Sequence, residues 1–145
     1  MKSVVRRLGI DTTGDTELID ITPRVREVVE ELGVAEGVVY VTTLHTTTAI
    51  TVNEGLADIA DDIVSTLRRL APEAAGYRHA RFLHSDGQMA VNSPSHQRSA
   101  LLGMQVAFPI SEGQMVMGAR QTIYFVELDG PLHREFVVHV IGLQK

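Results

Sequence analysis

Hydrophobic spacing predicts an amphipathic helix near the start of the chain, in residues 22–33. Its apolar side chains recur at i, i+3, i+4 and i+7, which places them on one face of a helix. They are Val25, Val28, Val29 and Leu32. Thr22 is a suitable N-cap, Pro23 suits the first helical turn, and Gly33 can end the helix.

A second helix is predicted in residues 53–72, where apolar side chains again have helical spacing and Pro72 stops the helix. We expect these side chains to form a buried stripe: Leu56, Ile59, Ile63 and Leu67. A short third helix is predicted in residues 95–103. Residues 73–94 are irregular and rich in small and polar types, and a connection of that length in a compact domain is often functional.

The remaining segments are rich in β-branched and apolar residues and are predicted to be strands. They are residues 3–11, 17–21, 37–45, 47–53, 104–110, 114–128 and 135–142. The pattern predicts an α+β protein with mainly antiparallel strands and two substantial helices, in a single domain that spans residues 1–145.

Size and composition indicate a globular protein and exclude several classes. Of 145 residues, 44% are hydrophobic and 21% are charged, which is typical of a folded domain. The net charge of −5 argues against nucleic acid or an anionic membrane as the main partner, and no run of 18 apolar residues is present to span a membrane. The absence of cysteine removes thiolate zinc sites and cysteine nucleophiles and fits a reducing compartment, so we expect a soluble cytoplasmic protein.

Three of the six histidines lie in notably polar surroundings. His45 lies in a β-prone segment and precedes a run of threonines, while His84 opens and His96 closes a polar segment. Three neutral imidazoles suit a catalytic divalent metal such as zinc, with water or substrate in the open position. These ligands would have to converge from three separate elements, and the alternative is three unrelated polar histidines. His79 is predicted to be solvated, and His139 is predicted to be structural or surface-facing.

A second polar cluster lies near the C-terminus. Glu127 and Asp129 are two residues apart on a predicted strand, so they can face the same side and share a cation or take part in acid–base chemistry. The alternative is a solvated strand end followed by a tight turn. Arg134 can bind a phosphate with two hydrogen bonds, or it can pair with one of these two carboxylates. The third helix begins near Ser95 and His96, where free N–H groups suit an anion.

Three longer motifs connect these residues along the chain. They are LHTTTAITVNE, then LHSDGQMAVNSPSHQRSALLG, then FPISEGQMVMGARQTIYFVELDGP. In this order they resemble the YjbQ family, whose members are known as uncharacterised conserved proteins or secondary thiamine-phosphate synthases. The resemblance runs from about Leu18 to Gly142.

The matched positions can be given motif by motif. The family's histidine-threonine-threonine motif corresponds to His45, Thr46 and Thr47. Its histidine, asparagine and histidine segment corresponds to His84, Asn92 and His96. Its late glutamine and its glutamate-aspartate-glycine-proline motif correspond to Gln121, Glu127, Asp129, Gly130 and Pro131.

The chain departs from the family pattern at two places. The family usually has tryptophan directly before the late glutamine, where this chain has Arg120. It usually has arginine directly after the proline, whereas here Leu132 and His133 precede Arg134. Both departures leave the contact with an anion or substrate open in this region.

The resemblance implies a compact β-sandwich with two or three helices packed outside, assembled as a homotrimer. It implies that His45, His84 and His96 hold a divalent metal ion, such as zinc. The activity that it implies is the joining of an aminopyrimidine diphosphate to a thiazole phosphate, which gives thiamine phosphate and pyrophosphate.

Roles follow for the other matched residues. Glu127 or Asp129 accepts or positions a proton, and Gln121 belongs to the same catalytic group. We expect the phosphorylated substrate to contact Thr46, Thr47, Asn92, Ser95 and Arg134. Two other functions stay open: a metal-dependent hydrolase of a small phosphorylated or cyclic substrate, and a non-catalytic trimeric protein whose cluster binds a metal or ligand.

Overall fold

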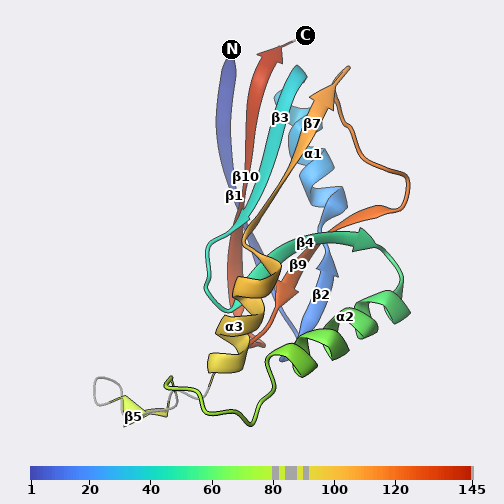
Figure 1. Ribbon diagram of the computed structural model, residues 1–145. Helices are drawn as coiled ribbons and strands as arrows, with labels where there is room; N and C mark the ends of the chain where they lie inside the picture. The colour runs from blue at the N-terminus through green and yellow to red at the C-terminus, as the bar shows by residue number, and fades with distance from the viewer. Residues whose placement is uncertain (80–81, 84–87, 90–91, 145) are drawn as a thin grey trace.

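The structure is a computed structural model that describes residues 1–79, 82–83, 88–89 and 92–144 (Figure 1). Its elements follow the chain in this order: β1 (Lys2–Asp11), β2 (Glu17–Asp20), α1 (Thr22–Leu32), β3 (Val34–Thr43), β4 (Thr48–Glu54), α2 (Ala57–Leu70), β5 (Phe82–Leu83), β6 (Gln88–Met89), α3 (Ser93–Leu102), β7 (Gln105–Ser111), β8 (Gln114–Met115), β9 (Gln121–Glu127) and β10 (His133–Gln144).

The strands form two main sheets. One has the order β1-β10-β3-β7-β8 and the other the order β2-β9-β4, while β5 pairs with β6. The strand pairs within the sheets are antiparallel. The fold is therefore α+β with mainly antiparallel strands and three helices in the described part of the chain, as the sequence predicts.

The main core lies between the five-stranded sheet and a layer made of α1 and the three-stranded sheet (Figure 1). Alternate residues of β10, Phe136 and Val138, are fully buried here together with Ile123 and Phe125 of β9. The predicted apolar face of α1 packs into the same core with Val25, Val28, Val29 and Leu32. One face of the large sheet is thereby covered, which removes apolar surface from water.

A second, smaller core covers the other face of β9. Tyr124 and Val126 point away from the main core and pack with Leu128, Ala49 of β4 and Leu67 of α2. Because side chains alternate along a strand, both faces of β9 are buried. Glu127, the last residue of this strand, is consequently enclosed and has no exposed surface.

The ends of α1 agree with the sequence at one end and differ at the other. Gly33 ends the helix in the left-handed conformation with φ of 63°, which glycine adopts without steric cost. Thr22 is not the N-cap: its Oγ1 accepts a hydrogen bond of 2.8 Å from the Ile123 amide. Asp20 Oδ1 accepts from the Thr22 amide at 2.9 Å instead. The Thr22 hydroxyl is used to attach α1 to β9, which spacing within the helix could not indicate.

The predicted buried stripe of α2 is wrong in part. Leu67 is buried, but Ile59 and Ile63 are half-buried, and Leu56 is 49% exposed just before the helix begins. Figure 1 shows the reason, because α2 lies beside the three-stranded sheet at the lower end of the molecule and not between two layers. A helix in that position covers its apolar face only where it meets the sheet.

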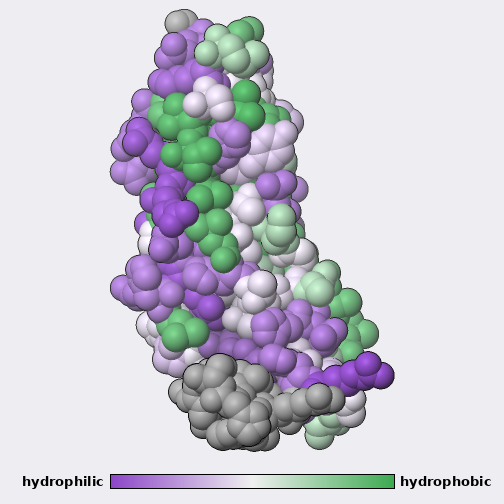
Figure 2. Space-filling model, turned by 90° about the vertical axis from the view of Figure 1, so that its left-hand side faces the viewer, coloured by the Kyte–Doolittle hydropathy of each residue, from purple (hydrophilic) through white to green (hydrophobic). Residues whose placement is uncertain are grey.

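The edge of the large sheet is formed by β1, whose Val4, Leu8 and Ile10 are partly buried against the core. Figure 2 faces this side of the molecule and shows a band of hydrophobic side chains bordered by hydrophilic ones. No helix in the described residues is long and apolar enough to cross a membrane.

Candidate functional site

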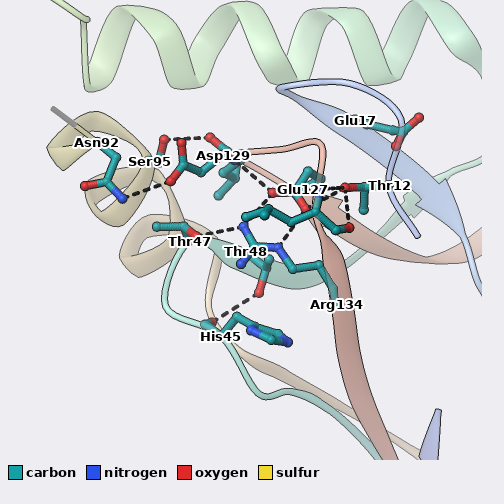
Figure 3. Close-up of polar contacts among 12 residues, drawn as sticks. Thr12, Glu17, His45, Thr47, Thr48, Asn92, Ser95, Glu127, Asp129 and Arg134 are labelled. Carbon is teal, nitrogen blue, oxygen red and sulfur yellow. Dashed lines mark hydrogen bonds and ion pairs between the residues drawn. The ribbon is translucent and has the colours of Figure 1, made fainter. Parts of the chain in front are cut away.

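The candidate site is built around a buried ion pair between Glu127 at the end of β9 and Arg134 at the start of β10 (Figure 3). Arg134 Nε donates to Glu127 Oε2 at 2.8 Å, and Arg134 Nη2 donates to Glu127 Oε1 at 2.7 Å. The Glu127 side chain is 0% exposed, and the Arg134 side chain is 7% exposed. Two parallel hydrogen bonds fix the relative orientation of the two groups more strictly than one contact would.

The Glu127 carboxylate is fully occupied by four hydrogen bonds. Besides the two from Arg134, Oε2 accepts from Thr12 Oγ1 at 2.9 Å, and Oε1 accepts from the Asp129 amide at 2.9 Å. A carboxylate has about four acceptor positions. Burial alone would raise the pKa of Glu127, but the hydrogen bonds from Arg134, Asp129 and Thr12 outweigh burial and lower the pKa below its ordinary value. Glu127 is therefore an ionised group that holds its neighbours in place.

Threonines connect this ion pair to the loop between β3 and β4. Arg134 Nη2 also donates to Thr47 Oγ1 at 2.8 Å, and the Thr47 carbonyl accepts from the Leu128 amide at 3.1 Å. Thr48 Oγ1 donates to the His45 carbonyl at 3.1 Å. Thr46 is exposed and faces solvent. The threonine run thus holds a loop against β9 and β10 and leaves one hydroxyl at the surface.

His45 follows β3 and uses its ring to bind the backbone of β10. Its Nε2 accepts a hydrogen bond of 2.8 Å from the Glu135 amide. A neutral imidazole has one acceptor nitrogen and one donor nitrogen, so the proton is on Nδ1. Burial, followed by the positive charge of Arg134, lowers the pKa of His45 below its ordinary value. The ring is neutral at pH 7 and points away from Asn92 and Asp129 (Figure 3).

A second set of polar side chains, which we call the Asn92 group, lies where α3 begins. It consists of His79, Asn92, Ser95, His96 and Asp129. Asn92 Nδ2 donates to Asp129 Oδ2 at 2.9 Å, and the Asn92 amide oxygen lies 3.0 Å from His79 Nε2. The rings of His79 and His96 meet edge to face with centroids 5.2 Å apart. Ser95 Oγ donates to the Leu128 carbonyl at 2.6 Å and fixes α3 beside the ion pair.

Most of the residues predicted for the site are joined by this network. The structure brings together Thr47, Asn92, Ser95, Glu127, Asp129 and Arg134. Gln121 is at the other end of β9, six residues from Glu127 and so about 20 Å away along an extended strand. Its exposed side chain accepts from the Gly118 amide at 2.7 Å. Gln121 is therefore not brought to the catalytic group.

The proposed metal ligands can be located only in part. His84 lies outside the described residues. Within the part of the chain that the structure describes, no three histidine, aspartate or glutamate side chains are grouped to hold a metal ion. His45 has its acceptor nitrogen engaged by the Glu135 amide. Among the described residues, His96 is the one predicted ligand that lies in the Asn92 group.

The two departures from the family pattern lie at the surface. His133 Nδ1 and Asp11 Oδ1 are 2.6 Å apart, and both side chains are largely exposed. Arg120 is 84% exposed and lies 3.6 Å from Glu54. The two residues inserted before Arg134 do not remove it from the ion pair. Leu132 and His133 are exposed at the surface, and Arg134, the next residue, is buried.

Sequence reasoning missed two residues of the site. Thr12 donates to Glu127 and accepts from the Leu132 amide at 2.9 Å, although it lies in a turn-rich segment at the end of β1. The antiparallel register of β1 and β10 could have indicated Thr12. It places Asp11 opposite His133, so the next residue, Thr12, lies beside Leu132. His79 is exposed as predicted, but it contacts Asn92 and His96.

Comparison with known proteins gives a consistent result. Residues 6–143 match the family model described as UPF0047 protein YjbQ-like. A UPF0047 protein of Methanothermobacter thermautotrophicus is 37% identical over 98% of this chain and 94% of its own length. One of Archaeoglobus fulgidus is 36% identical over 92% of this chain and 98% of its own length.

Solved structures agree with the sequence relatives. A YbjQ-like protein of unknown function from Sulfolobus solfataricus has a TM-score of 0.89 and 30% identity, over 97% of this chain and 98% of that one. An uncharacterised conserved protein of the YjbQ/UPF0047 family from Clostridium acetobutylicum has a TM-score of 0.83 and 34% identity, over 94% and 99% of the two chains. By sequence and by fold, the chain belongs to the YjbQ (UPF0047) family.

Proposed function

We propose that the chain is a transferase resembling thiamine-phosphate synthase, which joins an aminopyrimidine diphosphate to a thiazole phosphate. In that reaction a carbon–nitrogen bond forms, the bond between carbon and diphosphate breaks, and pyrophosphate leaves. The matched motifs support this activity. The observation that carries it is the Asn92 group, in which two imidazoles, an amide and a carboxylate meet at the beginning of α3.

The beginning of α3 is suited to part of the anionic substrate. No described side chain caps this helix, which leaves the Ser93 and Ser95 amides for an anion, whereas Pro94 between them has no N–H. His96 lies in the first turn of the helix and can donate a hydrogen bond to a phosphate oxygen, whereas a neutral His79 already donates from Nε2 to the Asn92 amide oxygen. Arg134 is committed to Glu127 and Thr47, which favours the second of its two expected roles, pairing with a carboxylate. We assign it to positioning.

The role of positioning a proton is better assigned to Asp129 than to Glu127. All four acceptor positions of Glu127 are filled, and its lowered pKa keeps it ionised. Asp129 is half-buried, and Asn92 holds it by Oδ2. Its Oδ1 accepts no hydrogen bond from a described residue. The thiazole nitrogen that forms the new bond carries no proton, so this step needs no base. We therefore propose that Asp129, oriented by Asn92, positions a proton of the substrate's amino group.

Substitution of Asp129 tests this function. With both substrates supplied, the chain should form thiamine phosphate, and Asp129→Asn should lower kcat by about 100-fold, the order expected when a hydrogen bond to a charged group is lost. Asp61→Asn, at an exposed position on α2, is the matched control and should retain full activity. Release of phosphate or pyrophosphate without the thiazole substrate would instead support a hydrolase, and equal kcat in both variants would refute the role of Asp129.

A divalent metal ion, such as zinc, is part of the proposal and rests on the family resemblance. Such an ion would neutralise negative charge on the diphosphate. His96 fits the role of a ligand, because its ring lies in the Asn92 group. His45 does not fit in this arrangement, because Nε2 accepts the Glu135 amide and the remaining nitrogen carries the proton.

Metal content can be measured without reference to activity. In protein purified without an affinity tag, we expect close to one zinc ion per chain and a large loss of zinc in the variant His96→Ala. His133→Ala removes an exposed ring that pairs with Asp11 and should leave the zinc content unchanged. Full zinc occupancy in His96→Ala would end the assignment of His96 as a ligand.

We further propose a homotrimer in the cytoplasm, as the resemblance and the cysteine-free sequence suggest. Support for a subunit contact comes from the outer face of the large sheet, where apolar side chains line a shallow hollow of about 330 Å³. They are Val5, Tyr40, Val137 and Ile141. Val5 is 58% exposed in the single chain. Covering such a face with another subunit would remove apolar surface from water.

Native mass measurements test the trimer. The wild-type mass should be a multiple of three times the 15.9 kDa chain mass, and Val5→Glu should abolish the threefold contact by placing a charge in the apolar hollow. Val116→Glu is the control, because Val116 is 53% exposed but follows β8 at the opposite edge of the sheet from β1. A wild-type mass of one or two chains would contradict the trimer.

A further inference from the structure

Helices α2 and α3 border an apolar groove at the surface, whose inner side chains Ile63, Leu67 and Leu102 also pack in the smaller core. The groove has a volume of about 400 Å³. Its apolar lining consists of Ile59, Ile63, Leu67, Leu70, Leu101 and Leu102. Leu70 and Leu101 are 65% and 57% exposed. Contiguous apolar patches at a surface commonly mark interaction sites.

The charges along α2 reverse sign from one end to the other. Three aspartates lie in its first half, at Asp58, Asp61 and Asp62, and two arginines lie in its last turn, at Arg68 and Arg69. Asp62 and Arg69 are seven residues apart, which is about two helical turns, so both lie on nearly the same side of the helix. Asp62 lines the groove, and Arg69 Nη2 donates to Thr66 Oγ1 at 3.1 Å on the groove side.

We propose that the groove binds the α2 helix of a second copy of this chain, with the two α2 helices antiparallel about a twofold axis near Thr66. In that arrangement Asp62 of each copy lies opposite Arg69 of the other, and the exposed leucines of both copies are covered. A twofold contact uses the same patch on both subunits, so a patch whose charges are self-complementary is what it requires. An acidic or basic partner protein would match only one half of α2.

The pairing is independent of the proposed trimer and of the proposed reaction. It uses α2 and α3, whereas the trimer contact is proposed on the outer face of the large sheet. If both contacts form and the twofold axis meets the threefold axis at a right angle, the assembly closes with six chains. Failure of one contact then leaves three chains or two chains, and the two proposals can be judged separately.

A single cysteine placed near the proposed axis tests the pairing directly, because the chain has no cysteine of its own. Thr66→Cys should form a disulfide between two copies under mild oxidation, since residues on a twofold axis face their own counterparts. Asp61→Cys is the matched control on the opposite side of α2 and should remain largely uncrosslinked. Crosslinking of Thr66→Cys no faster than Asp61→Cys would overturn the proposal.

A charge exchange provides a second measurement that leaves the apolar lining intact. Arg69→Glu should halve the native mass. The acidic side chain at position 69 of each copy would then lie opposite Asp62 of the other copy, and the two negative charges would repel each other. Adding Asp62→Arg in the same chain should restore the original mass, since the pair is regenerated with its signs exchanged. An unchanged mass in Arg69→Glu, or no recovery in the double variant, would overturn the pairing and leave the groove to a different partner.

Discussion

The ion pair of Glu127 and Arg134 is the constraint on which the site depends. A carboxylate without exposed surface is stable as an ion only if its charge is paired and its oxygens are hydrogen-bonded, and here four bonds meet that condition. Those bonds fix the ends of β9 and β10, the turn at Thr12 and the loop at Thr47 relative to one another. The position of the Asn92 group follows, because the Leu128 carbonyl and Asp129 hold the start of α3.

Much of the fold could be predicted because local spacing determines it. The apolar side of α1 and the antiparallel strands follow from periodicity, but the incomplete burial of α2 depends on how wide the neighbouring sheet is, which no local pattern contains. The site was predictable where a motif holds its residues together, as for Glu127 and Asp129. Within the chain, Gln121 and Glu127 lie at opposite ends of β9, a separation that the motif does not indicate. Thr12 was missed because its contact depends on strand register.

The site separates groups that hold the structure from groups that are open to a ligand. Glu127, Arg134 and Thr47 are buried and have their hydrogen bonds satisfied by one another. His79 and Asp129, in contrast, lie at the surface or half-buried around the beginning of α3. A rigid, buried pair that supports a more exposed polar group is the arrangement expected of a preorganised binding site.

The pH dependence of stability with and without Glu127 tests the central claim most directly. The pKa of Glu127 is lowered by folding, so its contribution is complete above about pH 4.3, the ordinary pKa of glutamate, and is lost as the pH falls through the lower folded value. Urea unfolding at pH 7 should show Glu127→Gln to be less stable by about 3 kcal/mol, the order of breaking a buried pair. That difference should shrink as the pH is lowered toward 3. A difference under about 1 kcal/mol at pH 7, as for a surface ion pair, or one that does not change with pH, would contradict the account.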